Sequence, residues 1–375
     1  MKNTNKPVKN ISKSKIAIIL GTRPEIIKMA PVIKECQKQK LPFFIIHTNQ
    51  HYTFNLDKIF LKELNLPAPK YNLNVGSGTH GKQTGLMLIR IEKVLMKEKP
   101  DIVLVEGDTN TVLAGALAAI KLHFQVGHIE AGLRSYFREM PEEINRIITD
   151  HISDFLFAPT TLAYKNLIKE GISKKKIFIA GNTIVDSVLQ NVILAQKKSK
   201  ILNELNLKKD NYFLLTLHRQ ENVDNQERLK NIFEGLKLIF DKYQLPIIYP
   251  IHPRTKKMIK KFHLLIPQGV KVIEPVGFFD FLILEQNAKL VFTDSGGVQE
   301  ETCILKTPCL TLRDNTERPE TVKVKANILA GSNPDNILKC AKIMLRRKRN
   351  WRNPFGNGTA AKKIIEIIQK KNTYI

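Results

Sequence analysis

The 375-residue sequence predicts an α/β protein built from two doubly wound units that face each other across a cleft. Short apolar runs of strand length alternate with longer amphipathic stretches, which is the pattern of repeated β–α units around a parallel sheet. The alternation pauses in a polar, helix-like stretch at about residues 188–210 and then starts again. A chain of this length is also long for one hydrophobic core, so two packed units are expected.

Apolar runs followed by polar or glycine-bearing turns mark the expected strands. They lie at residues 16–20, 43–47, 102–106, 126–130, 155–158 and 177–180 in the first unit, and at 212–217, 247–251, 270–274, 290–293 and 308–312 in the second. The expected division is a flexible basic tail at 1–14, a first unit at 15–190, a second unit at 191–357 and an amphipathic helix at 358–375. Periodicity alone leaves open which unit the last helix packs on.

The composition argues against several classes of protein. Hydrophobic residues make up 43% of the chain, yet no run approaches the ~18–20 consecutive apolar residues that a membrane-spanning helix needs. The lysine-bearing N-terminus lacks the apolar core of a signal peptide, so we expect a cytoplasmic protein. The four cysteines are Cys36, Cys303, Cys309 and Cys340. They form no CxxC pair, so we expect neither a disulfide framework nor a zinc site.

The formal charge of +25 has three explanations: nucleic-acid binding, an acidic small substrate, or general lysine enrichment. Lysines are spread along the whole chain beside apolar residues, whereas a nucleic-acid-binding protein concentrates them among aromatic residues. We therefore favour solvated helix faces. A basic nucleic-acid-binding protein is the alternative from a different class, supported by charge alone.

In doubly wound sheets, ligands bind beyond the carboxyl ends of the strands. At one such end, Ser295, Gly296 and Gly297 stand between an expected strand and an expected helix. Free backbone N–H groups and the helix dipole would hold a diphosphate there. A turn that needs glycine only for its backbone angles explains the same residues equally well. Glu301, one helical turn further on, is a candidate acceptor for ribose hydroxyls.

Basic residues follow the first expected strand of each unit. Arg23 offers a planar fork of donors to phosphate oxygens, and Lys28 lies about one helical turn further on. A surface ion pair between Arg23 and Glu25 is the alternative. His218 follows the first strand of the second unit, where a cation would face the phosphates from the opposite wall. His252 has the same placement after the next strand.

Acidic residues follow successive elements of the first unit. They are Asp108, Glu130 and either Glu142 or Glu143, with Arg134 and Arg146 nearby. Carboxylates brought together titrate at separate pKa values, so one can act as a base while another holds a proton. Taken singly, each is also explained as a helix cap or an ion-pair partner, and Asp108 fits an N-cap.

No cofactor is expected, neither nicotinamide nor metal. Residues 76–81 fit the GxGxxG pattern, but residues 71–75 before them make a poor buried strand. The motif also lies outside the first β–α unit, where a dinucleotide fingerprint belongs. The His, Asp and Glu residues lack the spacing of a metal site.

Several segments together resemble one enzyme family, the non-hydrolysing UDP-N-acetylglucosamine 2-epimerases, and archaeal-type members most closely. They are GTRPEIIKMAP, GDTNTVLAGALAA, GHIEAGLRS, MPEEINR, GNTIVD, TLHRQEN, PIHPRT, DSGGVQEE and RDNTERPE, in the family's order. The resemblance runs from about Lys15 to the carboxyl end. It implies a GT-B-like pair of Rossmann-like domains with the active site between them, a final helix that returns to the first domain, and a homodimer.

The resemblance also implies roles for individual residues. Asp108, Glu130 and Glu142 correspond to acid/base carboxylates, and His218 to a catalytic or phosphate-facing histidine. The implied substrate-binding residues are Arg23, Lys28 and Arg146 as basic groups, Ser295, Gly296 and Gly297 at the diphosphate, Glu301 at the ribose, Val276 to Phe281 at the uracil, and Arg318 near the sugar phosphate.

The implied reaction eliminates UDP from UDP-N-acetylglucosamine to give 2-acetamidoglucal. UDP then returns while a proton reaches the other face of carbon 2, which gives UDP-N-acetylmannosamine. A 2-epimerase of a UDP-2,3-diacetamido glucuronate is the alternative within the family, because the acid/base set does not separate these substrates. Many bacterial members have Gln-His-Arg where this chain has Gln50-His51-Tyr52. In those relatives this segment belongs to a second substrate site that activates the enzyme.

Overall fold

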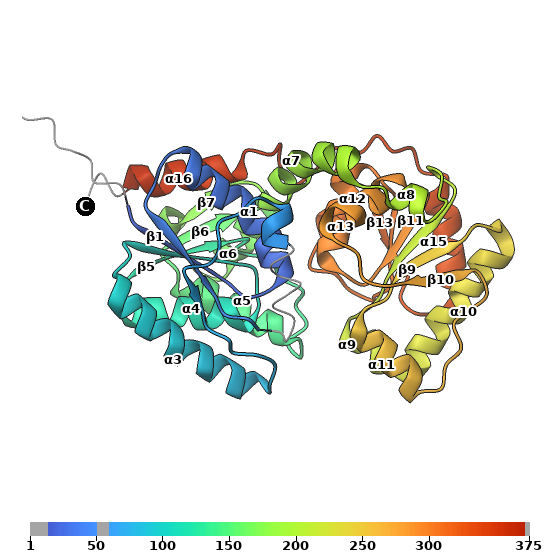
Figure 1. Cartoon of the computed structure of the whole chain (residues 1–375), viewed down its shortest axis with the longest axis horizontal. Helices are drawn as coiled ribbons and strands as arrows, with labels where there is room; N and C mark the ends of the chain where they lie inside the picture. The colour runs from blue at the N-terminus through green and yellow to red at the C-terminus, as the bar shows by residue number, and fades with distance from the viewer. Residues whose placement is uncertain (1–13, 51–59, 372–375) are drawn as a thin grey trace, which may run out of the picture.

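The computed structural model describes residues 14–50 and 60–371. Nearly all of the predicted tail lies outside the described residues. So do His51 and Tyr52, where the sequence departs from that of many bacterial members. Two parallel sheets, each with helices packed around it, stand side by side (Figure 1). This arrangement of two Rossmann-like units is GT-B-like, so the predicted fold class is confirmed.

The first sheet has the strand order β3-β2-β1-β4-β5-β6-β7. Its strands are β1 (Ile16–Leu20), β2 (Phe43–His47), β3 (Tyr71–Asn72), β4 (Ile102–Glu106), β5 (Gln125–Ile129), β6 (Phe155–Ala158) and β7 (Ile177–Ile179). The helices are α1 (Arg23–Lys38), α3 (His80–Glu98), α4 (Asn110–Lys121), α5 (Pro141–Ile152), α6 (Thr161–Lys169), the short 3-10 helix η1 (Lys174–Lys176) and α7 (Thr183–Lys198). Ile18 of β1 belongs to the core that contains α1 and α7, whereas Ile19 belongs to the core that contains α3 and α4. The sheet is thus buried on both faces, and its strands therefore read as continuous apolar runs.

The second sheet has the strand order β10-β9-β8-β11-β12-β13. Its strands are β8 (Phe213–Thr216), β9 (Ile247–Pro250), β10 (Val270–Ile273), β11 (Leu290–Thr293), β12 (Cys309–Thr311) and β13 (Asn327–Leu329). The helices that follow α7 are α8 (Ile201–Glu204), α9 (Gln220–Val223), α10 (Gln226–Tyr243), α11 (Pro253–Lys261), α12 (Phe278–Asn287), α13 (Gly296–Leu305), α14 (Pro319–Lys323), α15 (Pro334–Leu345) and α16 (Ala360–Lys371).

The direction of winding reverses at one position in each sheet. The reversal lies between β1 and β4 in the first sheet, and between β8 and β11 in the second. Ligands of doubly wound proteins bind at this switch point, beyond the carboxyl ends of the strands. Arg23, Asp108, His218 and Ser295 each follow one of these four strands, so the topology places them at the two switch points.

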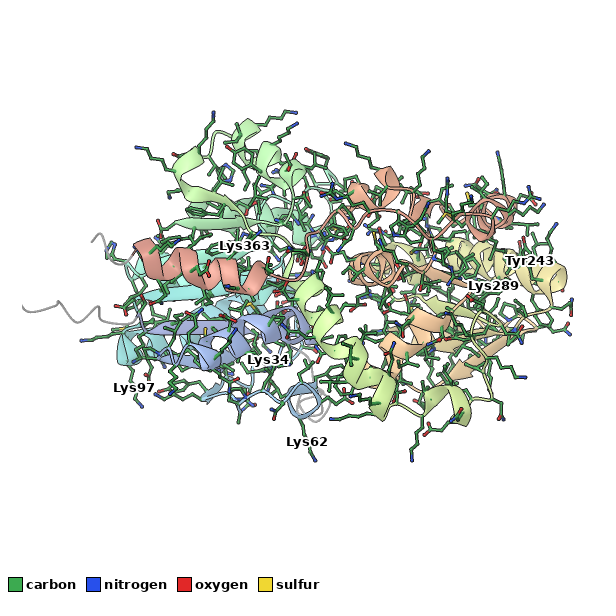
Figure 2. All side chains as sticks on the ribbon, turned by 90° about the horizontal axis from the view of Figure 1, so that it is seen from above. Lys34, Lys62, Lys97, Tyr243, Lys289 and Lys363 are labelled. Atoms are coloured by element: carbon green, nitrogen blue, oxygen red, sulfur yellow. The ribbon has the colours of Figure 1, made fainter. Side chains whose placement is uncertain are left out.

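Helices α7 and α16 connect the two units. Figure 1 shows α7 between the two sheets and α16 over the first sheet, and Figure 2 shows α16 running beside α1. Ile364 and Ile368 of α16 are fully buried against the first unit. The Asp186 carboxylate of α7 accepts hydrogen bonds from the N–H groups of Ala360 and Ala361, at 3.2 and 3.0 Å. It thereby satisfies donors in the first turn of α16.

Two strands differ from the sequence-based expectation. β3 has two residues and β13 has three, and each lies at an edge of its sheet. Each contains an asparagine that interrupts the apolar run, whereas β7 and β12, which have three residues each, lie in continuous runs that were predicted. The strand predicted at residues 126–130 is β5, which lies one residue earlier, so Glu130 is in the turn after the strand.

The positive charge is not confined to one element. Exposed Lys62, Lys97 and Lys363, labelled in Figure 2, belong to residues 60–63, to α3 and to α16. Within the described residues, no helix combines the length and the apolar character that crossing a bilayer requires.

Candidate active site

Five charged side chains meet where the two units touch, and we call them the buried ion cluster. They are Lys28 of α1, Glu106 at the end of β4, Glu130 after β5, Glu300 of α13 and Arg318 just before α14. None is more than 7% exposed. The first three belong to the first unit and the last two to the second.

The two cations of the cluster are shared among its carboxylates. Lys28 Nζ lies 2.7 and 2.6 Å from the two carboxylate oxygens of Glu130, 3.2 Å from Glu300 Oε2 and 3.6 Å from Glu106 Oε1. Arg318 Nη2 lies 2.7 Å from Glu130, and its Nε lies 2.5 Å from Glu300. Asn182, at the start of α7, donates to Glu300 at 2.8 Å and to Glu130 at 3.3 Å. These contacts join the first unit directly to the second.

The cluster gives its carboxyl groups different proton affinities. Burial raises the pKa of Glu300 to about 7, although Arg318 and Lys28 oppose the rise. Burial would also raise the pKa of Glu130, but Arg318 and Lys28 outweigh it and hold that pKa well below its ordinary value. Glu130 also has a φ of 71°, a left-handed conformation that is uncommon for a residue with a side chain. The chain thus turns sharply after β5, and the turn places an ionised carboxylate between two cations.

A second set of side chains is partly exposed, and we call it the solvent-facing group: Asp108, Glu142, His218 and Arg219. The side chains of Asp108, Glu142 and His218 keep 27%, 36% and 36% of their accessible surface. Arg219 Nη1 of the second unit lies 3.7 Å from Glu142 Oε1 of the first. Groups from both units therefore meet here as well, within reach of a dissolved ligand.

The choice between Glu142 and Glu143 is decided by their contacts. Glu143 is 1% exposed and accepts hydrogen bonds from Ser135 N and Oγ, both at 3.0 Å, and from Tyr136 N at 2.8 Å. It also pairs with Arg146. Glu143 thus holds the turn that follows Glu130, whereas Glu142 is the member of the pair that faces solvent.

Asp108 pairs with Arg146 and does not cap a helix, contrary to the alternative reading of its position. The N-cap of α4 is Thr109, whose side chain accepts from Thr111 N. Arg134, which the sequence placed near the acidic set, lies elsewhere: it pairs with Asp150 at 2.7 Å and with Glu170 at 2.5 Å. Arg134 is therefore a structural residue.

His218 lies beside a buried acid of its own unit. Its Nδ1 is 3.4 Å from Asp294 Oδ1, and Asp294 also accepts the backbone N–H groups of His218 and Arg219 at 2.9–3.1 Å. Burial lowers the pKa of His218, Asp294 opposes this, and Arg219 and Arg23 add to the lowering. The ring of His252 lies 5.5 Å from that of His218, and its Nδ1 accepts from Arg254 N as the cap of α11.

The expected diphosphate cradle lies at the start of α13, with Ser295 as N-cap and Gly296 and Gly297 as the first helical residues. A Cβ atom on Gly296 would lie 2.4 Å from Glu317 Oε1, so the close approach of that carboxylate requires glycine. Burial would raise the pKa of Glu317, but nearby guanidinium groups, Arg313 and Arg219 foremost, hold it well below its ordinary value. The start of α13 therefore lies next to the ionised carboxylate of Glu317, and the charge of this carboxylate is balanced by arginine side chains.

The remaining expected binding residues lie on both sides of the junction. The Arg23 guanidinium is 4.9 Å from the Phe60 ring. Glu25, its partner in the alternative interpretation, is buried and accepts from the N–H groups of Gly21 and Thr22. Val276 and Phe281 are partly buried and pack on the core shared by both units.

The segment expected at the uracil contacts Glu63, and it also contacts α7, where Lys198 Nζ lies 5.6 Å from the centroid of the Phe279 ring. Glu63 Oε2 accepts the N–H of Phe278, the first residue of α12, at 3.1 Å. A Cβ atom on Gly277 would lie 2.5 Å from Glu63 Oε1, so this approach also depends on a glycine. Glu63 therefore links the first unit to residues 276–281 of the second.

Glu301 stands next to a second buried acid, Glu285 of α12. Burial raises the pKa of Glu301 to about 7, and burial together with the neighbouring Glu301 raises the pKa of Glu285 well above its ordinary value. The two neighbouring carboxyl groups thus share an environment that favours the protonated form of Glu285.

Several residues of the site were not singled out from the sequence: Glu106, Glu300, Glu317, Arg313, Asp294 and Asn182. Glu106 and Glu300 each stand within two residues of a predicted site residue, and that proximity was the available signal. Among the described residues, no group of three or more His, Cys, Asp or Glu side chains is arranged to hold a metal ion.

Comparison with known proteins gives consistent matches along the chain. A family model described as UDP-N-acetylglucosamine 2-epimerase matches residues 34–369. A protein of Methanocaldococcus jannaschii with the same description is 62% identical over 360 residues, which cover 94% of this chain and 98% of the relative. Another from Methanococcus maripaludis is 60% identical over 360 residues, with the same coverage.

A solved structure extends this similarity to the fold. It is the M. jannaschii UDP-GlcNAc 2-epimerase in complex with UDP-GlcNAc and UDP, with a TM-score of 0.91 and 62% identity. The match covers 95% of this chain and 99% of that one.

Proposed function

The chain belongs to the UDP-N-acetylglucosamine 2-epimerase family, and we propose from this premise that it interconverts UDP-N-acetylglucosamine and UDP-N-acetylmannosamine. The observation that carries the proposal is the match over nearly the whole chain to a relative solved with UDP-GlcNAc and UDP. The archaeal relatives also favour this substrate over a UDP-2,3-diacetamido glucuronate and favour an isomerase over a nucleic-acid-binding protein.

The proton on carbon 2 of the sugar is barely acidic, because carbon 2 is not next to a carbonyl group. A carboxylate can remove it only while the bond from carbon 1 to the diphosphate oxygen breaks and positive charge develops at carbon 1. The electron pair of the C–H bond then forms the double bond of 2-acetamidoglucal, and UDP leaves with the pair of the C–O bond. UDP adds back as a proton reaches the other face of carbon 2, which inverts that centre.

We assign the proton transfers to carboxylates on the first unit. Asp108 and Glu142 are partly exposed and lie within reach of a bound sugar. Arg318 and Lys28 keep Glu130 ionised, so it is available as a proton acceptor, but the same two cations make it a weaker base than an ordinary carboxylate. The two faces of carbon 2 need two such groups, and successive turns of the first unit supply them.

The departing diphosphate needs cations and N–H donors. His218 and Arg219 after β8, Arg23 after β1, Arg146 on α5 and the start of α13 are the groups that would meet it. Preorganised positive groups at a developing negative charge lower the barrier for departure. We place the ribose at Glu301 and the uracil at residues 276–281, beside the junction closed by Glu63.

Solvent exchange at carbon 2 tests the proposal. UDP-N-acetylglucosamine incubated with the protein in deuterated water, without added nicotinamide, should gain deuterium at carbon 2 and equilibrate with the manno epimer, as followed by NMR. Absence of exchange would refute the proposed activity. The UDP-2,3-diacetamido glucuronate, run in parallel, should exchange more slowly.

We further propose that the protein acts as a homodimer in the cytoplasm, as the family resemblance implies. Light scattering of the purified chain tests the oligomeric state, because a mass of one chain would contradict it.

A further inference from the structure

The buried ion cluster contains one more carboxyl group than it has cations. Glu106, Glu130 and Glu300 would carry three negative charges, while Lys28 and Arg318 carry two positive ones. None of these groups is more than 7% exposed. An uncompensated charge at a buried position costs roughly several kcal/mol. The cluster is therefore expected to retain one proton.

The contacts indicate which carboxyl group holds it. Glu130 touches both cations at 2.6–2.7 Å, and Glu300 touches Arg318 at 2.5 Å and Lys28 at 3.2 Å. Glu106 has Lys28 as its only cation partner in the cluster, at 3.6 Å, which is the longest contact of the five side chains. Its Oε1, like Glu300 Oε2, has no hydrogen-bond partner among the described residues. The carboxyl groups of Glu106 and Glu130 lie within hydrogen-bonding distance of each other. A neutral Glu106 can therefore donate to Glu130, whereas two ionised groups would repel each other.

We propose that Glu106 is a positioning residue that retains the proton of the cluster and donates it as a hydrogen bond to the carboxylate of Glu130. The bond orients Glu130 and leaves its charge intact. Burial raises the pKa of Glu106 well above its ordinary value; Lys28 opposes the rise, and Glu130 and Glu25 add to it.

Charged groups lie around Glu106 on four segments of the chain. Lys28 and Glu25 come from α1, Glu130 follows β5, Glu300 belongs to α13 and Arg318 precedes α14. When the pH rises through the pKa of Glu106, the group ionises, repels Glu130 and competes for Lys28. The wild-type rate constant for exchange at carbon 2 should therefore fall on the alkaline side.

Two substitutions separate this role from simple packing. Glu106→Leu removes the donor and should lower kcat about ten- to hundredfold, the effect of losing one hydrogen bond to a charged group. Glu106→Gln keeps an uncharged donor, so it should retain more turnover than Glu106→Leu. It should also lack the alkaline fall, because an amide does not ionise. An unchanged alkaline limb in Glu106→Gln would overturn the proposal.

A measurement without turnover tests the proton itself, since the kinetic test rests on the proposed function. The infrared difference spectrum between wild type and Glu106→Gln, at neutral pH and without ligand, should show the loss of a protonated-carboxyl band. Glu300→Gln, the matched variant, should keep that band. If the band persists in Glu106→Gln and disappears in Glu300→Gln, the proton belongs to Glu300 and the proposal is wrong. Failure of exchange in the wild type would refute the activity and leave this measurement valid.

Discussion

The buried ion cluster and the solvent-facing group both join the two units, but they do so in opposite ways. The cluster excludes water and holds its ions at 2.5–3.6 Å. The solvent-facing group keeps about a third of the surface of Glu142 and His218 exposed, and its contact between the units is a longer one of 3.7 Å. The comparison indicates a division of work, in which the cluster aligns the units and the solvent-facing group remains free to meet a ligand.

The energies of the two sets should differ accordingly. An exposed ion pair contributes about 0–1 kcal/mol to stability, because water and salt screen it. Removing one partner of a buried pair costs about 3–5 kcal/mol, because the remaining charge loses both water and partner. Substitutions that leave a charge unpaired in the cluster should therefore lower stability as well as rate, whereas substitutions in the solvent-facing group should lower rate alone.

The largest effect is expected at Lys28. Lys28→Met leaves three carboxyl groups with one cation, so the free energy of unfolding should fall by about 3–5 kcal/mol and epimerisation should cease. Urea unfolding measures the first effect and deuterium exchange the second. Lys38→Met, on the same helix at a 75% exposed side chain, is the control and should change stability by less than about 0.5 kcal/mol. Equal midpoints for the two variants would show that the cluster does not stabilise the fold.

The adjacent Glu142 and Glu143 offer the sharpest test of the division. Glu142→Gln should lower kcat about 10²–10⁴-fold without moving the unfolding midpoint, because it removes an acid/base group that faces solvent. Glu143→Gln should instead reduce the free energy of unfolding by about 2–3 kcal/mol, since it weakens the bonds to Ser135, Tyr136 and Arg146. The reverse outcome, in which Glu143 controls rate and Glu142 controls stability, would exchange their roles.

A smaller, pH-dependent effect is expected at Glu285, which has no ion pair among the described residues. Its folded pKa is raised, so between the ordinary value of 4.5 and that raised value the folded protein keeps a proton that the unfolded chain has released. Stability therefore falls as the pH rises through this window. Glu285→Gln removes the titrating group. Its stability should equal that of wild type at about pH 4 and exceed it by about 1 kcal/mol or more at about pH 8. A difference that is independent of pH would contradict this assignment.

The sequence predicted the strands that are buried on both faces, because such strands read as uninterrupted apolar runs. The edge strands β3 and β13 were not predicted, since an asparagine interrupts the apolar run in each of them. Asp108, Glu130, Lys28 and Arg318 were each named, but their pairing was not visible.

The pairing of Lys28 with Glu130 depends on how distant segments of the first unit fold together, and the pairing of Arg318 with Glu130 depends on how the two units dock; no local sequence pattern encodes either. The choice between Glu142 and Glu143 depends on the helical phase of α5. Both residues lie in its first turn, and only the turn after Glu130 determines which of them is buried.

The return of α16 to the first unit has a consequence for the order in which the molecule is built. Its isoleucines cover α1 and α7, yet the ribosome makes them only after the whole second unit. Until then the apolar surface of α1 and α7 that α16 covers is exposed, and the Asp186 carboxylate lacks the N–H groups of α16 as partners. Native contacts between segments so distant in the chain form slowly, and exposed apolar surface in the meantime favours aggregation. The first unit is thus translated before the second but completed after it. Its exposed apolar surface makes it the part of the nascent chain that is most prone to aggregation.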